Sequence, residues 1–294
     1  MKKILAIISA MVIAMSSLAG CGSKEASQSQ SSKEESNQNT ASGAPANKLE
    51  KIKSSGKLIV GTSPDFVPME FEDISSGKKE YVGADIELAK YIAEKLGVEL
   101  EIKAMEFMAI QQAVMSDVVD LGISGFAKRP DREEAMYLSD FYNMSGKDGQ
   151  GLIVPAEKAS QYTTAESFAG KKIAAQNASL QQSLASESLP EDIELKPVAT
   201  TTDGILMLTS GKVDAMAVSL DTCKNLIEAN PQIAIAEYKF PYVSEGNVIA
   251  LKKGEDALLE EVNKILAEVN ESGIFKTWKD DANALAKKLN IKTE

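Results

Sequence analysis

The sequence predicts an α/β protein whose two similar lobes are joined by two crossing segments. From Leu58 onward, short runs rich in β-forming residues alternate with stretches of helical periodicity, a pattern typical of α/β units with mostly parallel sheets. A similar order of elements recurs from Gly170 onward. The chain then ends with one more strand and helices that have no sheet of their own, so we expect them to return to the first lobe.

The first residues indicate an export signal and not an element of the fold. MKKILAIISAMVIAMSSLAGC places two lysines before an apolar stretch that is too short to span a membrane. Its Leu-Ala-Gly-Cys ending resembles the lipobox of bacterial lipoproteins, which implies a signal peptide over residues 1–20 and a lipid such as palmitate on Cys21. An ordinary signal peptide next to an unrelated cysteine is the alternative.

Residues 21–48 are rich in Ser, Gln, Asn, Lys and Glu and contain almost no large apolar side chain. Such a segment cannot bury enough surface to fold. We therefore predict a flexible tether that ends just before a folded part beginning near Leu49.

Composition excludes several classes of function. The formal net charge is −11, and loss of the signal peptide with Lys2 and Lys3 would make it more negative. An acidic chain without a basic face argues against a nucleic-acid partner. With Cys21 lipidated, Cys223 is the only thiol, so no internal disulfide is expected. The chain has no histidine, which removes the commonest general base and any histidine metal site.

The first unit contains three predicted strands and two predicted helices. KLIVGTS (57–63), VELEIKAM (98–105) and VVDLGISG (118–125) are the strands. ADIELAKYIAEKLG (84–97) predicts a helix with Asp85 as a candidate N-cap and Gly97 at its end, and FMAIQQAVMSD (107–117) predicts a shorter one. In the longer helix, one face carries Ala89, Ile92, Ala93 and Leu96.

The second unit repeats this order. GKKIAAQNAS (170–179), IELKPVAT (193–200) and GKVDAMAVS (211–219) predict strands that match those of the first unit. FPYVSEGNVIALKKG (240–254) predicts the returning strand. The helix after it has Leu258, Val262, Ile265, Leu266 and Val269 on one face and ends at Gly273.

Across about Lys51 to Lys288, the chain resembles the extracytoplasmic solute-binding proteins of ATP-driven importers, in the family that binds polar amino acids. The matching segments are GKLIVGTSPDFVPMEF, YVGADIELAKYIAEKLG, VVDLGISGFAKRPDREEAMYLSDFY, GKKIAAQNASLQ, GKVDAMAVS and ESGIFKTWKDD, in family order. The resemblance implies the two-lobed periplasmic-binding-protein-like fold with two hinge crossovers (type II). It places lobe 1 at residues 50–143 plus 247–294 and lobe 2 at 149–241.

The resemblance also implies a site for a ligand carboxylate. In the family's Gly-x-Thr-x-x-x-x-Arg segment the arginine clamps the carboxylate, and Gly125 to Arg132 fits that spacing, with Ala127 replacing the usual hydroxyl residue. A guanidinium suits a planar carboxylate because it offers two parallel hydrogen bonds. The alternative is that Arg132 pairs with Glu133 or Glu134. We interpret Lys128 and Arg129 as solvated loop charges.

Four more residues match family positions that contact the ligand. Ser179 matches a hydroxyl residue that grips the carboxylate from lobe 2, although it could be only a helix N-cap. Phe66 and Phe107 match two aromatic rings that enclose the ligand side chain, with core packing as the alternative. Gln176 matches a position that touches the ligand side chain.

The chain departs from the family at the ammonium end of the site. Ser63 and Ser219 occupy the positions where many members have acids. Asp65 and Asp221 lie two residues further on and could replace them, but Asp221 could equally cap a helix. The ligand is therefore either an amino acid held by the Gly125 carbonyl and a shifted acid, or a carboxylate without an α-ammonium.

The sequence thus predicts a monomeric, lipid-anchored binding protein that delivers a small polar amino acid to an importer's permease and ATPase, without cofactor, metal or catalysis. One alternative is a surface lipoprotein of this fold that senses or adheres. A dehydratase-like or lyase-like enzyme, with Glu106 or Asp65 as acid or base, is the other.

Overall fold

A computed structural model of the protein describes residues 47–144 and 149–289. The predicted signal peptide, Cys21 and all but the end of the predicted tether lie outside the described residues. Asn47 caps helix α1 (Lys48–Ser55), so the helix begins one residue before Leu49. Lys48 is buried and pairs with Asp117 and, at 2.8 Å, with Asp120, which shows why this residue belongs to the fold and not to the tether.

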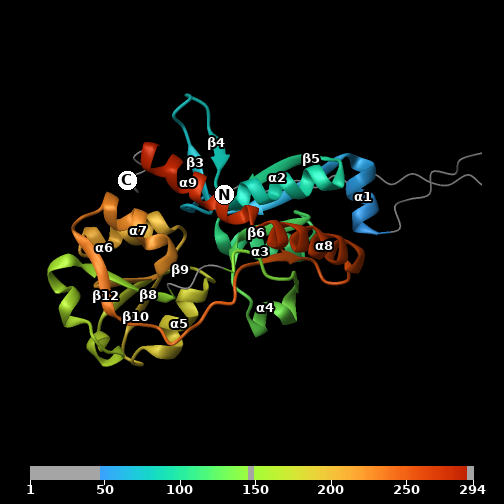
Figure 1. The fold of residues 1–294 in the computed structure, drawn as a ribbon. Coiled ribbons are helices and arrows are strands. Elements are labelled where there is room, and N and C mark those ends of the chain that lie inside the picture. The colour runs from blue at the N-terminus through green and yellow to red at the C-terminus, as the bar shows by residue number, and fades with distance from the viewer. Residues whose placement is uncertain (1–46, 145–148, 290–294) are drawn as a thin grey trace, which may run out of the picture. The chain divides into compact units, whose positions relative to one another are not determined.

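The first sheet has five strands in the order β5-β1-β6-β13-β7. The central strand pairs are parallel, β1 with β5 and β1 with β6, whereas β13 runs antiparallel to both β6 and β7. We call this sheet and the helices packed on it lobe 1 (Figure 1). Its strands are β1 (Lys57–Thr62), β5 (Glu99–Ala104), β6 (Leu121–Phe126), β7 (Tyr137–Leu138) and β13 (Val248–Leu251). Its helices include α2 (Ala84–Leu96), α3 (Phe107–Met115) and α4 (Pro130–Ala135).

The second sheet, which defines lobe 2, repeats this arrangement with the order β10-β9-β11-β8-β12. Again the first three strands are parallel, and the fourth, β8, runs antiparallel to both of its neighbours, β11 and β12. The predicted repeat is therefore confirmed at the level of sheet topology. The strands are β8 (Gln150–Pro155), β9 (Lys172–Gln176), β10 (Glu194–Val198), β11 (Ala215–Ser219) and β12 (Ile233–Lys239). The helical segments are η1 (Ala156–Gln161), η2 (Ala165–Phe168), α5 (Leu180–Ser188), α6 (Thr201–Thr209) and α7 (Leu220–Ala229).

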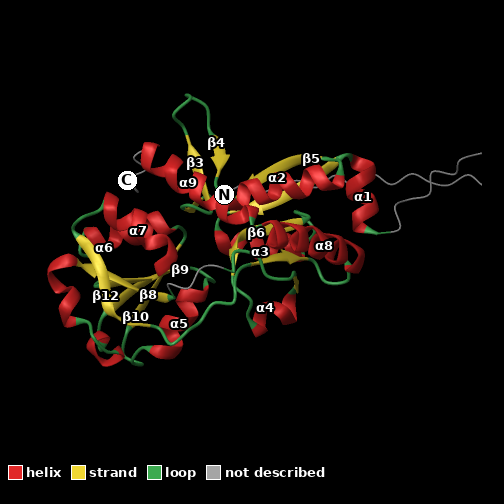
Figure 2. Ribbon diagram, in the orientation of Figure 1, coloured by secondary structure: helices red, strands yellow, loops and turns green. Residues whose placement is uncertain are grey.

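A small third sheet had no counterpart among the predicted strands. It is antiparallel and consists of β2 (Asp65–Phe66), β3 (Glu70–Asp73) and β4 (Glu80–Val82), seen as short yellow arrows in Figure 2. These strands have only two to four residues each, too few for periodicity to reveal them. The sheet matters because it carries Phe66 and Glu70, which reappear in the site.

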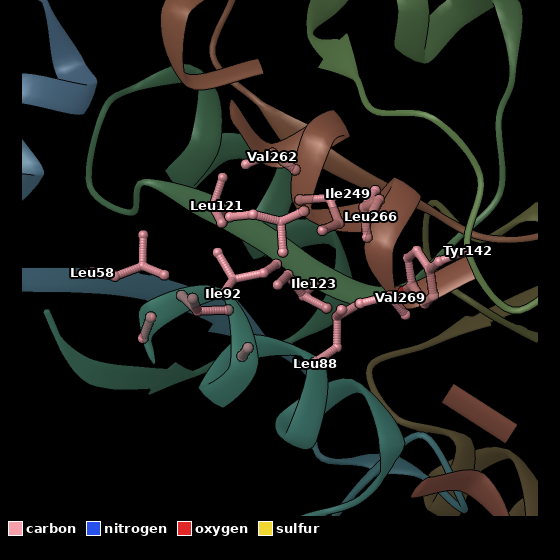
Figure 3. Packing of buried hydrophobic residues seen from close by; sticks show 14 of the residues in the cluster. Leu58, Leu88, Ile92, Leu121, Ile123, Tyr142, Ile249, Val262, Leu266 and Val269 are labelled. Atoms are coloured by element: carbon pink, nitrogen blue, oxygen red, sulfur yellow. The ribbon is translucent and has the colours of Figure 1, made fainter. Parts of the chain in front are cut away.

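The core of lobe 1 lies between its sheet and two helices of distant origin. Helix α2 comes from the first unit and α8 (Asp256–Ser272) from the end of the chain, and Figure 3 shows their apolar side chains meeting around β6. The last helix, α9 (Ile274–Leu289), packs against α2 and α8 and also reaches α7 of lobe 2. The predicted buried faces are confirmed, since all the predicted residues are at most 6% exposed: Ala89, Ile92, Ala93, Leu96, Leu258, Val262, Ile265, Leu266 and Val269.

The start of α2 differs from the prediction. Its N-cap is Gly83, and Asp85 lies in the first helical turn, fully buried, so the N-cap assignment for Asp85 is wrong. Gly83 has φ +128°, and a Cβ there would lie 2.2 Å from the Met69 carbonyl oxygen. Only glycine fits this close approach.

Two segments connect the lobes, as predicted. The chain leaves the first sheet after β7, builds the whole second sheet, and returns through β13. Tyr142 and Asn247, one in each crossing segment, exchange two backbone hydrogen bonds of 2.8 Å. Within residues 47–144 and 149–289, none of the helices has the length and hydropathy that a membrane crossing requires.

Candidate functional site

A pocket that is partly open to solvent is lined by side chains from both lobes. Its residues lie where β1, β6, β9 and β11 end, the edge at which α/β sheets commonly bind ligands. The structure brings all the predicted binding residues except Asp221 to this pocket: Ser63, Asp65, Phe66, Phe107, Gly125, Ala127, Arg132, Gln176, Ser179 and Ser219. The lining also includes seven residues that were not predicted: Glu70, Ser124, Gln150, Leu180, Gln181, Ser244 and Asn247.

Arg132 places a buried positive charge in the pocket. Its side chain is 2% exposed, and its guanidinium donates to the carbonyl oxygens of Ala127 and Ala178, each at 2.8 Å. Burial lowers the Arg132 pKa to about 10, so it remains charged at neutral pH. No carboxylate of the described residues lies within 4 Å of the Arg132 guanidinium. The ion pair with Glu133 or Glu134, which the sequence left as an alternative, is therefore not formed. Three of the five guanidinium N–H groups are left for a ligand anion.

The rings of Phe107 and Phe126 hold the guanidinium in place. Each ring centroid lies 5.3 Å from the Arg132 Cζ atom, a cation–π distance, and the two rings pack against each other at 4.7 Å. Phe107 is 7% exposed and belongs to the core of lobe 1, yet it also lines the pocket. Phe107 therefore lines the pocket and packs in the core of lobe 1, two roles that the sequence left as alternatives.

Ser179 lies at the N-terminus of α5 in lobe 2. Its hydroxyl oxygen accepts a hydrogen bond from the Gln182 backbone N–H at 3.1 Å, so it is an N-cap, and it also lines the pocket. The preceding Ala178 has φ +58° and presents its carbonyl to Arg132. The partial positive charge of a helix N-terminus thus faces the same pocket as the Arg132 guanidinium.

Arg129 is not the solvated charge that we expected. Its Nη1 donates to the Ser179 carbonyl oxygen at 3.1 Å, its Nε donates to Asp131 at 2.9 Å, and its side chain is only 18% exposed. Lys128 does match the expectation, because it is exposed and pairs with Glu133 at 3.1 Å. Arg129 and Arg132 both therefore link lobe 1 to the segment before α5.

Gly125 is held by three neighbours and cannot carry a side chain. Its φ is +57°, and a Cβ would lie 2.9 Å from Cε1 of Phe66, which lines the pocket. Its N–H donates to Asp85 and its carbonyl accepts from Asn247, both at 2.8 Å. Because Asn247 occupies that carbonyl, an ammonium group at Gly125 would have to share it.

Asp65 forms the main polar link between the lobes. Its Oδ1 accepts from the Ser63 hydroxyl at 2.8 Å, and its Oδ2 accepts from the Thr201 backbone N–H at 2.5 Å and from Gln176 Nε2 at 3.2 Å. Burial raises the Asp65 pKa, although these three donors oppose the shift. Gln176 and Asp65, which were predicted as separate ligand contacts, both line the pocket and are hydrogen-bonded to each other.

Ser219 and Asp221 take different positions. Ser219 ends β11 and lines the pocket without capping α7 by its side chain. Asp221 lines an adjoining pocket and accepts from Lys279 of α9 at 2.7 Å. The structure therefore places Asp221 in an ion pair, neither beside the predicted ligand position nor as a side-chain cap.

Glu70 is the most buried carboxyl group in the pocket lining. It is 0% exposed, and its Oε1 accepts from the Ser124 hydroxyl at 2.6 Å. Burial raises its pKa well above the ordinary value. No motif marked Glu70 or Asn247 in the sequence, because both depend on contacts with residues more than fifty positions away. Glu106, the other candidate acid or base, is exposed and does not line the pocket.

The pocket combines an anion-binding end, apolar walls and buried carboxyl groups. That chemistry suits a zwitterion with an extended side chain, because the Arg132 guanidinium can bind a carboxylate and the acidic side chains can bind a cationic group. Within the described ranges, no group of three or more His, Cys, Asp or Glu side chains is placed to hold a metal ion.

Comparisons with known proteins show which family the chain resembles. Residues 58–281 match the family described as bacterial extracellular solute-binding proteins, family 3. The arginine-binding extracellular protein ArtP of Bacillus subtilis is 28% identical over 74% of this chain and 82% of its own length. The glutamine-binding protein GlnH of the same organism is 28% identical over 95% of this chain and 97% of its own length. The crystal structure of the amino acid ABC transporter substrate-binding protein AbpA from Streptococcus pneumoniae, bound to L-arginine, has a TM-score of 0.76 and 36% identity. It covers 83% of this chain and 99% of its own chain.

Proposed function

The chain belongs to family 3 of the bacterial extracellular solute-binding proteins, and from this premise we propose that it captures an amino acid with a cationic side chain, L-arginine being the first candidate. The observation that carries the proposal is the buried Arg132 guanidinium, which lines the pocket without a carboxylate partner in the described chain. A buried charge is costly unless it is paired. A ligand carboxylate supplies that pairing.

The remaining pocket residues fit the rest of such a ligand. Ser179 and the N-terminus of α5 offer further donors for the carboxylate from lobe 2. Phe66 and Phe107 provide apolar walls for an aliphatic stem. Asp65 and Glu70 add negative charge, which favours a cationic side chain over an acidic one. Arginine-binding relatives support the same choice.

We propose that ligand binding favours contact between the lobes. A ligand carboxylate held by Arg132 from lobe 1 and by Ser179 from lobe 2 stabilises the arrangement in which both residues face one pocket. The joined lobes would then be recognised by the permease of an ATP-driven importer. The protein would act as a monomer and would perform no chemistry on its ligand.

The N-terminal assignments are part of the same proposal. A lipid on Cys21 would fix the protein to the outer face of the cell membrane, and the residues between Cys21 and Asn47 would serve as its tether. The lipobox-like Leu18 to Cys21 supports this proposal. Lobe limits of 50–143 plus 247–294 and of 149–241 remain our working boundaries, and the sheet membership of the strands agrees with them.

The test is a thermal-shift screen of the purified protein, unfolded in guanidinium chloride and refolded to remove carried ligand, against the common amino acids and related carboxylates. A ligand at a hundred times its Kd stabilises the folded state by about 2.7 kcal/mol. For a chain of this size, that is a rise in Tm of roughly 5 to 10 °C. A rise with L-arginine supports the proposal, whereas a response only to carboxylates without an ammonium group would replace it.

A further inference from the structure

Two buried carboxyl groups, Glu70 and Asp85, are neighbours beside the pocket: the Asp85 backbone N–H donates to the carbonyl oxygen of Met69 at 2.8 Å, and the two side chains accept from the adjacent residues Ser124 and Gly125. Glu70 belongs to β3 and lines the pocket, and Asp85 belongs to the first turn of α2. Both are 0% exposed. Neither was identified as a site residue in the sequence, and the binding of a carboxylate by Arg132 does not use them.

Each carboxyl group has one oxygen with donors and one without. Glu70 Oε1 accepts from Ser124 at 2.6 Å, and Asp85 Oδ2 accepts from the Gly125 N–H at 2.8 Å and from the Tyr142 hydroxyl at 2.9 Å. Glu70 Oε2 and Asp85 Oδ1 are buried and receive no hydrogen bond from the described residues. A proton on one carboxyl group, donated to the other, would satisfy both oxygens.

Among the described residues, no cation lies next to the pair. No Lys or Arg of the described chain lies within 4 Å of either group, and the other groups that act on them are Asp65 of β2, the Tyr142 hydroxyl and, at longer range, Lys279 of α9. Lys279 is itself paired with Asp221. Burial is the largest cause of the raised pKa in both groups. It raises the Asp85 pKa to about 6 and the Glu70 pKa well above the ordinary value. For Glu70, the neighbouring charge of Asp85 is the second cause. Two adjacent carboxylates cannot both ionise here without a cation.

We propose that the Glu70–Asp85 pair holds one proton while the pocket is empty, and that a cationic group of the ligand takes the place of this proton. The O–H bond of Glu70 then breaks and the proton leaves to solvent, so both carboxyl groups of the pair are ionised. The ligand cation balances the negative charge that the pair has gained. The inference rests on the proposed function, because it requires a cationic ligand in this pocket. It predicts that affinity for such a ligand rises with pH, by up to about tenfold per pH unit.

Glu70 is better suited to this exchange than Asp65. Three donors already satisfy both oxygens of Asp65, namely Ser63, Thr201 and Gln176. Glu70 has one donor, one oxygen without a donor, and a position in the pocket lining. Its spare acceptor capacity is therefore available to a ligand, once the shared proton has left.

The experiment is isothermal titration calorimetry of the full-length protein at pH 7, in phosphate and in Tris, with L-arginine and with L-citrulline. The two buffers differ in ionisation enthalpy, so the difference in measured heat counts the protons that binding releases. Citrulline has the shape of arginine but a neutral urea group in place of the guanidinium. Release of close to one proton with arginine alone assigns the exchange to the guanidinium, and release with both assigns it to the α-ammonium group.

Two isosteric variants and one control locate the proton. In Glu70→Gln the amide can donate to Asp85 and still accept from Ser124, so we expect no proton release and at least about tenfold weaker arginine binding. In Asp85→Asn the amide can donate to Glu70, which also abolishes release. Glu72→Gln alters a neighbouring acid of β3 that pairs with Lys79 at the surface, and it should release protons as the wild type does.

The outcomes separate this inference from the proposed function. Binding of arginine and citrulline without proton release refutes the inference alone. Undiminished release in both Glu70→Gln and Asp85→Asn refutes it as well. If no amino acid with a cationic side chain raises the Tm or gives heat, the proposed function fails and the inference with it. Because the wild-type titrations need no substitution, the inference stays testable even if both variants fail to fold.

Discussion

Lys279 of α9 and Asp221 of α7 form an ion pair that joins the C-terminal helix of lobe 1 to lobe 2. Their side chains are 13% and 22% exposed, and Lys279 Nζ lies 2.7 Å from Asp221 Oδ2. A second pair between the same helices, Lys287 with Glu228 at 3.4 Å, is far more exposed. Neither residue of the Lys279–Asp221 pair lines the ligand pocket, and Lys279 acts on Asp85 only at long range, so we expect the pair to change ligand affinity chiefly by stabilising contact between the lobes.

Substitution of Lys279 by Met removes the charge and retains most of the aliphatic stem. Exposed ion pairs contribute about 0.2 to 1 kcal/mol, and the low exposure of this pair places it near the upper end, at about 1 kcal/mol. If the pair forms only when the lobes meet, its loss reduces the binding free energy by that amount. Since a factor of ten in Kd corresponds to about 1.4 kcal/mol, the Kd for L-arginine should rise about fivefold.

The assay is calorimetric titration with L-arginine across a double-mutant cycle of Lys279→Met and Asp221→Asn. Each single variant should weaken binding, and the double variant should be no weaker than the worse of the two. Lys276→Met is the matched control, because Lys276 pairs with Asp280 within the same helix and is exposed. An unchanged Kd in Lys279→Met, or an equal loss in Lys276→Met, would refute the reasoning.

Three further predictions concern the pocket and the core. Arg132→Met should raise the Kd at least roughly a hundredfold, about 3 kcal/mol, because the ligand carboxylate loses a buried charged partner. Calorimetric titration measures the Kd. A cooperative melt followed by circular dichroism checks that the lobes remain folded. Gly125→Ala should lower stability by about 1 to 2 kcal/mol and weaken binding, since φ is +57° and the Cβ meets Phe66. Gly211 has φ +72° and open space where a Cβ would lie. As the control, Gly211→Ala should therefore lower the free energy of unfolding in a denaturant titration without weakening ligand binding. Burial raises the Cys223 pKa to about 12, so a thiol reagent at pH 8 should label it only after unfolding, and rapid labelling of the native protein would contradict the buried position.

The sequence by itself determined the main strands and helices of the two units, their repeat and the place of Arg132 at the pocket. Apolar periodicity marked the buried faces of α2 and α8, and glycine marked their ends at Gly97 and Gly273, both in the left-handed region. The spacing from Gly125 to Arg132 placed that arginine correctly in the pocket. These signals are local, so the chain carries them within a window of a few turns or one strand.

The tertiary structure alone decided how charged and polar side chains are paired. Asp85 has the local features of an N-cap, yet it is a fully buried group that receives donors from β6 and from Tyr142. Asp221 pairs with Lys279, fifty-eight positions away, and Gln176 pairs with Asp65 across the lobes. Charged side chains have no periodicity that reveals their partners, because burial and distance arise only when both lobes and the last helix have packed together. The pairing of carboxyl groups at the pocket, and with it the proposed sharing of a proton by Glu70 and Asp85, therefore follows from packing and not from local sequence.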